Sequence, residues 1–187
     1  MVKKKIVVGI TGASGSIYAQ RLLVKLCSIE SQIEEITLII SDTGEQVVDY
    51  ELEEELHKHE IIKTYANTSF FAPTASGSAG YHGMVIIPCT AGTMGRVASG
   101  TSNDLIARSA DVMLKERKPL ILVLRESPYN VIHIENMRVI AQAGGMIFPA
   151  SPSFYSKPKD IIQLVDTLVD RVISLLGFEI DRYKWGG

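Results

Sequence analysis

The sequence has few of the residues that would indicate a disulfide-rich, a nucleic-acid-binding or a membrane protein. Its two cysteines, Cys27 and Cys89, give no framework of bridges, so we expect a reducing, cytoplasmic environment. The net charge of −2 gives no indication of binding to nucleic acid or to a membrane surface. No apolar run reaches the roughly 18 residues that span a bilayer. The four histidines lack the spacing of a zinc site, so no metal is expected.

Apolar stretches that end in small, hydroxyl-bearing loops are what the sequence does have. The first, residues 6–10, stops at the loop of residues 11–15, and helical spacing of apolar residues begins at about Ser16. Loop amides and a helix N-terminus bind phosphate in many α/β domains, and Thr11 and Ser14 add hydroxyl donors. The loop's glycines lack the dinucleotide spacing, so it predicts either a mononucleotide site or a tight turn without a ligand.

The same alternation of apolar stretches and helical segments continues along residues 1–187, which we expect to form a single domain. Five buried strands are expected, at residues 6–10, 35–40, 84–88, 120–124 and 146–148. Helices are expected from 16, over 43–59, up to about 99, from a cap at Ser102 or Asn103 to 117, over 131–143 and over 159–176, with irregular chain at 64–83. Strands that alternate with helices indicate a three-layer, Rossmann-like (flavodoxin-like) α/β domain with a mostly parallel sheet.

Loops that follow the strands of a parallel sheet meet at one edge, which is where ligands bind. Loops 11–15, 89–93 and 125–128 are therefore expected to converge and to bring hydroxyls, backbone amides, one arginine and one glutamate together. Ser41 and Asp42 follow the second strand. An acid there would hold the ribose of NAD, whereas Ser41 would be the contact if the ligand were a flavin nucleotide.

Some polar residues have structural explanations that compete with functional ones. Asp104, Arg108, Asp111 and Lys115 share one helix face and predict two surface ion pairs between residues four apart. Cys89 is either a thiol activated at a helix N-terminus or a small buried residue at a strand end.

Several segments resemble one known family over nearly the whole chain. The two flavin loops of the UbiX family of flavin prenyltransferases are similar to GITGASGSIYAQRLL and PCTAGTMGRVASG. The more specific matches are LIARSADVMLKERKPLILVLRESP and FPASPSFYSKP. The family has the flavin-containing cysteine-decarboxylase-like fold. The departures are small: Lys118 stands where arginine is usual, Ser127 where threonine is usual, and Thr90-Ala91-Gly92 is a variant of the second loop.

The resemblance implies a transferase that builds prenylated FMN. A dimethylallyl group from dimethylallyl monophosphate is joined to N5 and C6 of reduced FMN without a metal, and the product serves a UbiD-type decarboxylase. The family forms large symmetric assemblies with active sites at subunit junctions. A homo-oligomer such as a dodecamer is therefore expected.

The resemblance also implies roles for individual residues. Contacts to FMN are expected from Gly12, Ala13, Ser14, Ser41, Thr90, Ala91, Gly92, Thr93 and Arg125. The prenyl phosphate is expected between Tyr155 and Arg171, where Tyr155 and Ser14 donate hydrogen bonds. Lys115 and Arg108 add charge from a neighbouring subunit or element, although surface pairing of Arg108 remains an alternative. Trp185 helps to cover the prenyl group, and the acid/base candidates are Glu126 and Glu51.

These residue types suit the chemistry. The departing phosphate needs hydrogen-bond donors, the allyl cation needs an aromatic pocket poor in water, and the proton lost at C6 needs an acceptor. Two other functions stay open. An FMN-dependent decarboxylase acting on a cysteinyl or aromatic acid would need an asparagine motif and a catalytic histidine that the sequence does not show. A flavin carrier for a partner decarboxylase would not need Glu126 or Tyr155.

Overall fold

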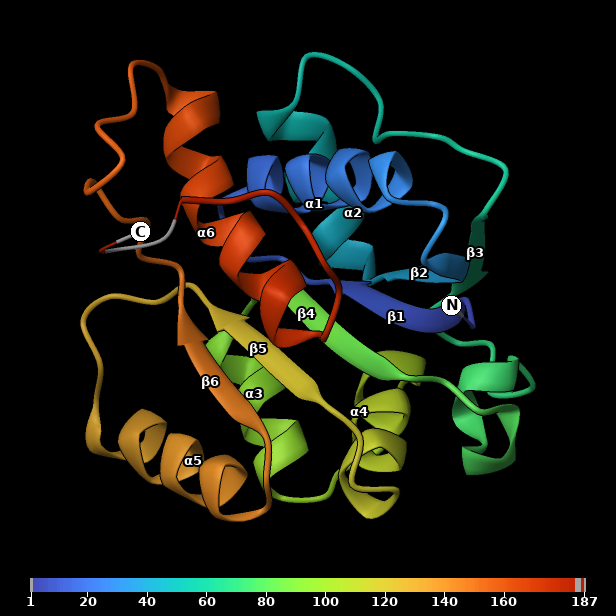
Figure 1. Ribbon diagram of the computed structural model, residues 1–187. Helices are drawn as coiled ribbons and strands as arrows, with labels where there is room; N and C mark the ends of the chain where they lie inside the picture. The colour runs from blue at the N-terminus through green and yellow to red at the C-terminus, as the bar shows by residue number, and fades with distance from the viewer. Residues whose placement is uncertain (1, 184–185, 187) are drawn as a thin grey trace.

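Buried apolar runs form a six-stranded sheet in the computed structural model, which describes residues 2–183 and 186 (Figure 1). The strands are β1 Lys4–Ile10, β2 Ile33–Ile40, β3 Ile62–Ala66, β4 Gly83–Cys89, β5 Leu120–Leu124 and β6 Met146–Pro149. Their order is β3-β2-β1-β4-β5-β6, and each neighbouring pair is parallel. In this doubly wound order the winding reverses between β1 and β4, which is where such folds bind ligands.

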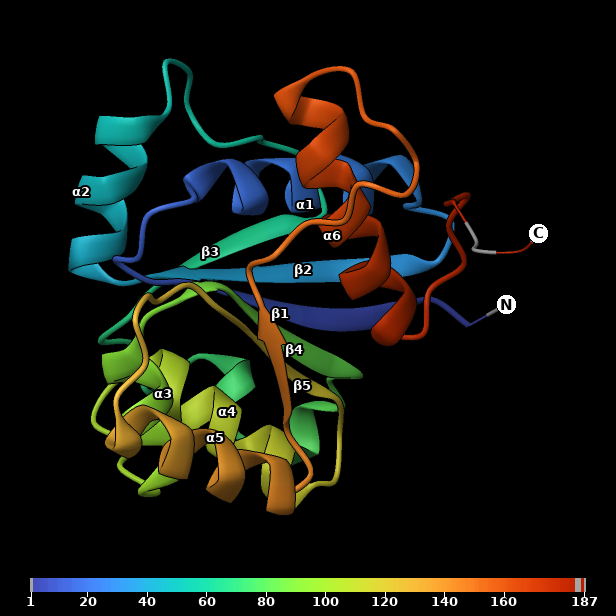
Figure 2. The ribbon, with the colours of Figure 1, turned by 90° about the vertical axis from the view of Figure 1, so that its left-hand side faces the viewer.

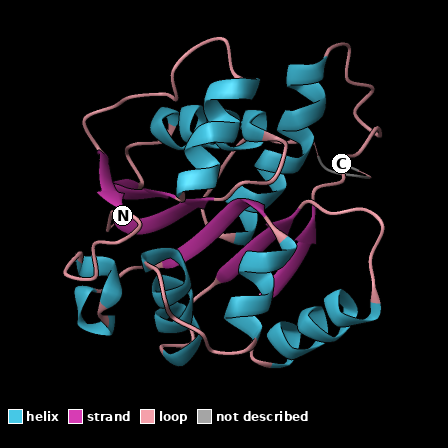
Figure 3. Cartoon of the chain, turned by 180° about the vertical axis from the view of Figure 1, so that it is seen from behind, coloured by secondary structure: helices cyan, strands magenta, loops and turns pink. Residues whose placement is uncertain are grey.

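Helices cover both faces of the sheet. They are α1 Ser16–Ser28, α2 Asp42–Glu51, α3 Ala91–Ala98, α4 Leu105–Lys115, α5 Val131–Gln142 and α6 Ile161–Leu175, with short 3-10 turns η1 Pro73–Ala75 and η2 Gly77–Ala79. Figure 2 shows α1, α2 and α6 on one face and α3, α4 and α5 on the other. Seen from behind, the sheet runs between these two helix layers (Figure 3). Within the described residues, the structure contains no helix long and apolar enough to cross a membrane.

Alternating side chains of β1 contribute to two separate cores. Ile6, Val8 and Ile10 are fully buried in a cluster with the apolar faces of α1 and α6. Val7 points to the other face and is buried in a cluster with residues of α3 and α4. Burial of each such side chain is worth about 1.5–3 kcal/mol, so both layers hold the central strand and its loop in place. The predicted three-layer α/β class is confirmed.

The prediction of five strands is wrong, because β3 is a sixth strand. It pairs with β2 at the edge of the sheet, and part of it lies in sequence that was expected to be irregular. Lys63 and Thr64 are exposed, since an edge strand is covered incompletely. The strand therefore lacks the continuous apolar run that marks the buried strands.

The predicted helix over 43–59 is also too long, because α2 ends at Glu51. Leu52 has extended backbone angles, and Leu52 and Leu56 pack against the core from the irregular chain that follows. The polar helical spacing past residue 51 was thus misleading, since two leucines on a loop can reach the core without a helix.

The start of α4 and its charged face also differ from the prediction. Asp104, rather than Ser102 or Asn103, caps the helix by accepting the N–H of Ala107 at 2.8 Å. The expected pairs between residues four apart do not form. Asp104 instead pairs with Arg96 of α3 at 3.2 Å, because a cap residue points away from its own helix face.

Candidate active site

One buried threonine joins the loops after β1 and β4. Thr11 Oγ1 donates to the carbonyl oxygen of Pro88 at 2.8 Å and accepts the N–H of Thr90 at 2.9 Å. The loop after β5 is tied to the same edge, since the N–H of Arg125 donates to the carbonyl of Cys89 at 3.1 Å. The three loops therefore converge as predicted. Thr11 itself is not a free hydroxyl donor for a ligand, because it is 2% exposed and its proton is used.

A carboxylate from α2 lies at the N-terminus of α1. Glu51 Oε2 accepts the N–H of Gly15 at 2.9 Å and that of Ser16 at 2.7 Å, and the Ser14 side chain also bonds to it. Burial alone would raise the pKa of Glu51, but the hydrogen bonds from Ser14, Ser16 and Gly15 bring it below its usual value. The group is therefore an ionised carboxylate at neutral pH, in a position that binds anions.

The first loop brings its backbone close to α2. A Cβ on Gly12 would lie 2.6 Å from Thr43 Oγ1, so only glycine fits there. Ala13 is buried, whereas the next residue, Ser14, is exposed. At Gly92 in the second loop a Cβ would meet nothing closer than 3.9 Å, so its backbone faces open space. The open space beside Gly92 suits the approach of a flavin nucleotide to the second loop, whereas Gly12 lets the first loop lie against α2.

Three helix N-termini point to this edge of the sheet. Ser41 caps α2 by accepting the N–H of Gly44 at 3.0 Å, and Thr90 caps α3 by accepting that of Thr93 at 3.0 Å. Thr93 is buried and also bonds to Thr90 through its hydroxyl, so inside this chain it orients the second loop. Glu51 already occupies the N-terminus of α1, so α2 and α3 are the helices whose positive dipole ends favour an anionic ligand at this edge.

The acid/base candidate Glu126 follows β5 directly. It is half-buried, and its Oε1 accepts the N–H of Ser127 at 3.0 Å. Arg125 beside it is exposed at the carboxyl end of the strand. Tyr155 is exposed in the loop between β6 and α6.

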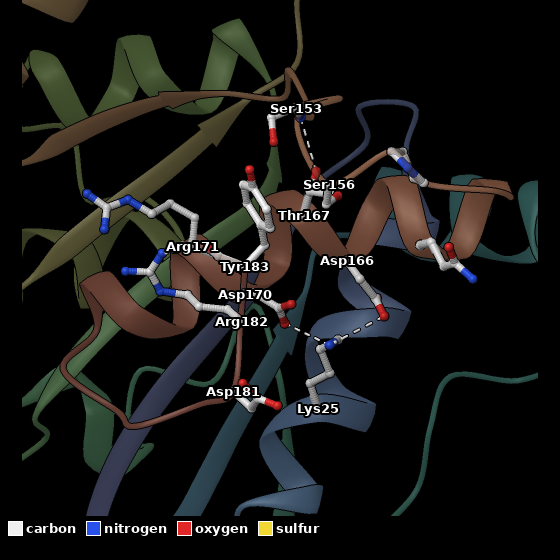
Figure 4. A pocket seen from close by; sticks show the side chains of 12 residues that line it. Lys25, Ser153, Ser156, Asp166, Thr167, Asp170, Arg171, Asp181, Arg182 and Tyr183 are labelled. Carbon is white, nitrogen blue, oxygen red and sulfur yellow. Dashed lines mark hydrogen bonds and ion pairs between the residues drawn. The ribbon is translucent and has the colours of Figure 1, made fainter. Parts of the chain in front are cut away.

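A separate cavity of about 500 Å³ beside α6 contains Arg171, the predicted phosphate-binding residue (Figure 4). Ser153 and Ser156 of the loop between β6 and α6 line it, and the N–H of Ser153 donates to Thr167 Oγ1 at 3.0 Å. We call this cavity the α6 pocket. Its lining, taken over the described residues, includes none of the predicted FMN contacts. Within a single chain, Arg171 and the flavin loops therefore border different spaces.

The predicted cations of α4 are not directed at the loops. Arg108 donates to the carbonyl of Ala75 at 3.2 Å and pairs with Asp111 at 3.0 Å, while Lys115 pairs with Glu116 at 2.6 Å. Lys115 ends α4 and so lies toward the edge where the strands begin, because α4 runs antiparallel to them. A role at the site therefore requires a neighbouring subunit. Trp185 lies outside the described residues.

Burial decides between the two interpretations of Cys89. The side chain is fully buried, and desolvation raises the pKa of the thiol to about 12. It is therefore a packed, protonated residue and not an activated nucleophile. The described residues also contain no group of three or more histidine, cysteine, aspartate or glutamate side chains able to hold a metal ion.

Two features of the site were not evident from the sequence. Thr11 and Ser14 are both hydroxyl-bearing residues of one loop, so residue type alone does not show that Thr11 is buried and Ser14 exposed. Only the place of Thr11 at the end of a buried strand indicated that it faces inward. Glu51 belongs to an acidic run typical of a solvated surface, and only the family resemblance distinguished it from its neighbours.

Known proteins are similar to this chain over nearly the whole length of both sequences. A model of the flavoprotein family matches residues 1–175. The flavin prenyltransferase UbiX of Methanocaldococcus jannaschii is 40% identical over 185 residues, covering 97% of this chain and 98% of the relative. That of Pseudomonas aeruginosa is 38% identical over 200 residues, covering 98% and 94%.

Solved structures of two such proteins are also similar to this chain. A UbiX protein, also named PadA1, crystallised with FMN and dimethylallyl pyrophosphate, is 34% identical with a TM-score of 0.89, covering 98% of each chain. A dodecameric FMN-dependent UbiX-like decarboxylase from Escherichia coli O157:H7 is 31% identical with a TM-score of 0.90, covering 98% of this chain and 100% of the other. Identity at this level along the whole chain, on a sheet of the same architecture, shows that this protein belongs to the flavoprotein family and, within it, to the UbiX flavin prenyltransferases.

Proposed function

We propose that this protein transfers a dimethylallyl group from dimethylallyl monophosphate to N5 and C6 of reduced FMN. The observation that carries the proposal is the joined pair of loops at the β1–β4 reversal, in a chain that belongs to a prenyltransferase family. Reduced FMN supplies the nucleophilic atoms, and the protein supplies binding, orientation and proton acceptors.

The two loops are suited to FMN. The space beside Gly92 is open, and the hydroxyls of Ser14, Ser41 and Thr90 lie at three helix N-termini. Gly12 lets the first loop lie close to α2. Arg125 follows β5 at the same edge and adds a positive charge. In the proposal, Ala13, Ala91 and Thr93 complete the flavin contacts.

Ser14 and Glu51 form a pair able to handle a proton. The hydrogen bond between them and the low pKa of Glu51 imply that the Ser14 hydroxyl donates to a carboxylate. The Ser14 oxygen then keeps a lone pair to accept an N–H of the ligand. A proton from the ligand can pass through the Ser14 hydroxyl to Glu51. Glu126 is the second proposed acceptor, for the proton lost when the new ring closes.

Arg171 and Tyr155 are proposed to bind the prenyl phosphate, and Trp185 to cover the prenyl group. Because the α6 pocket is lined by none of the predicted flavin contacts among the described residues, we propose that the complete site forms where subunits meet. The same arrangement would bring Lys115 and Arg108 of a neighbouring subunit to the phosphate. Leaving-group stabilisation by these cations and the Tyr155 hydroxyl would replace a metal ion.

The test is anaerobic incubation of the purified protein with reduced FMN and dimethylallyl monophosphate. We expect the flavin spectrum to change and its mass to increase by one dimethylallyl unit. Unchanged FMN would exclude prenyl transfer. An alternative is decarboxylation, because a 38% identical structure from Aquifex aeolicus is named a phenylacrylic acid decarboxylase. Release of CO₂ from a free aromatic acid by the FMN-loaded protein would favour that function instead.

The proposal also covers the partner protein, the oligomeric state and the cellular location. We propose that the product passes to a UbiD-type decarboxylase, that the chain forms a homo-oligomer such as a dodecamer, and that it acts in the cytoplasm. Exposed apolar side chains on α5, among them Val131, Ile132 and Ile134, support the assembly, because a second subunit would remove them from water.

A further inference from the structure

The α6 pocket contains two arginines from segments that are separate in the chain. Arg171 comes from α6, and Arg182 comes from the segment that follows this helix (Figure 4). Among the residues that the structure describes, the guanidinium of Arg182 has one weak hydrogen bond, at 3.4 Å, to the carbonyl of the adjacent Tyr183. In the described part of the chain neither arginine forms an ion pair, although both lie at one cavity of about 500 Å³.

The other charges of the pocket largely neutralise one another. Lys25 pairs with Asp170 at 2.7 Å and with Asp166 at 3.3 Å, and Asp166 also binds Arg21 at 2.8 Å. Figure 4 shows Lys25 and Asp166 on the α1 side, away from the guanidinium groups of Arg171 and Arg182.

The remaining carboxylate of the pocket is Asp181, which lies on the same side as Lys25 in Figure 4. The half that contains the two arginines also presents the hydroxyls of Ser153 and Tyr183. Guanidinium and hydroxyl donors together are the typical partners of a phosphate group.

The segment that carries Arg182 is fixed to the edge of the sheet where the strands begin, opposite the edge that carries the flavin loops. His82 Nε2 bonds to the carbonyl of Leu176 at 2.9 Å, and Lys4 Nζ donates to that of Gly177 at 3.1 Å. Gln32 makes two bonds to the backbone of Glu179, donating to its carbonyl at 2.8 Å and accepting its N–H at 3.0 Å.

Side chains of the same segment add to this anchoring. Phe178 is 4% exposed in the core, and Ile180 packs against that core. Arg182 therefore follows directly on a segment that is anchored as far as Ile180, and this segment leads it to the pocket.

We propose that Arg182 is a second phosphate-binding residue, which acts with Arg171 on the phosphate of the prenyl substrate. This inference rests on the proposed function. It adds a cation from the C-terminal segment, and it gives the contacts of Gln32 a positioning role, since they hold that segment against the body of the protein.

The test uses the FMN-loaded protein and the variant Arg182→Gln, with Lys58→Gln, at an exposed cation in the loop between α2 and β3, as the control for loss of a positive charge. We expect Arg182→Gln to raise the KM for dimethylallyl monophosphate by on the order of tenfold, as loss of one charged hydrogen bond predicts. The affinity for FMN and the thermal midpoint should stay at the wild-type values. Arg182→Lys should recover part of the loss, because it keeps the charge but not the planar fork.

A second measurement separates this inference from the function on which it rests. Calorimetric titration with inorganic phosphate needs no turnover, and phosphate should bind the wild type and Lys58→Gln more tightly than Arg182→Gln. Equal binding in all three proteins, or an unchanged KM in a wild type that does convert FMN, would overturn the role of Arg182. Failure of the wild type to convert FMN would instead overturn the proposed function.

Gln32→Ala tests the positioning role. The single variant should raise the KM less than Arg182→Gln does, and the double variant should be no worse than Arg182→Gln alone. Fully additive losses would show that Gln32 acts independently of Arg182 and would contradict the positioning role.

Discussion

Glu51 lies in an acidic run with Glu53, Glu54 and Glu55, and these three neighbours are exposed. Its carboxylate nevertheless binds the backbone at the N-terminus of α1. Nothing in the local sequence distinguishes it from the others, because the distinguishing contact is to a loop 36 residues earlier in the chain. Residue types predicted a site at this edge, but the partners of each side chain depend on tertiary contacts.

Glu51→Gln is expected to lower the free energy of unfolding by about 1 kcal/mol at neutral pH, because a charged acceptor is lost at a helix N-terminus. The pKa of Glu51 is depressed in the folded state, so its contribution is present above the ordinary glutamate pKa and disappears as the pH falls through the folded value. Urea unfolding of the FMN-free proteins should therefore show a difference at neutral pH that vanishes in acid. A difference that persists unchanged in acid would contradict this account.

Glu126→Gln should stall turnover while FMN still binds, since the carboxamide keeps an oxygen to accept the N–H of Ser127 but cannot take a proton. FMN affinity is measured by fluorescence quenching and turnover by the mass of the flavin. The exposed Glu54→Gln is the control and should match the wild type. Full turnover by Glu126→Gln would remove this residue from the acid/base role.

At the scale of elements, the sequence predicted the helices and strands whose bounds depend on apolar periodicity and burial. The central strands and most helices fall within a few residues of their predicted bounds, because each carries a continuous apolar run or face. The edge strand β3 and the end of α2 were missed, because both are set by pairing and packing with distant segments.

Thr11→Val tests whether the two loops depend on their shared hydrogen bonds. Valine has the same shape but leaves the N–H of Thr90 without its partner, while the carbonyl of Pro88 keeps only the backbone N–H of residue 11 at 3.3 Å. We expect stability to fall by about 1–3 kcal/mol and FMN affinity to decrease, as measured by urea unfolding and fluorescence titration. The surface hydroxyl variant Ser28→Ala serves as the control. Wild-type FMN affinity in Thr11→Val would show that the loops keep their geometry without this link.

At the scale of the whole molecule, the flavin loops and the α6 pocket were predicted to form one site but border different spaces in one chain. A sequence contains no direct signal for which residues meet across a subunit boundary. The exposed apolar side chains on the outside of α5 are the structural feature that supports the proposed assembly.

Ile132→Glu should therefore reduce the mass of the assembly, because Ile132 is 69% exposed on α5 and each copy would bury a charge at the interface. Light scattering after size exclusion measures the mass, and circular dichroism checks the fold. Val2→Glu, at a residue 88% exposed away from α5, should keep the wild-type mass. An unchanged mass in Ile132→Glu would exclude this face of α5 from the interface.

Both thiols of the molecule are sealed in its interior, with the pKa of Cys27 raised to about 11 and that of Cys89 to about 12 by burial. An alkylating reagent such as iodoacetamide needs a thiolate, so it should label the native protein only as fast as the chain opens. The labelling rate of each cysteine therefore measures the rate at which the structure opens around it. Comparing the labelling rate of Cys89 with and without FMN would show how much the bound nucleotide slows local opening at this edge of the sheet.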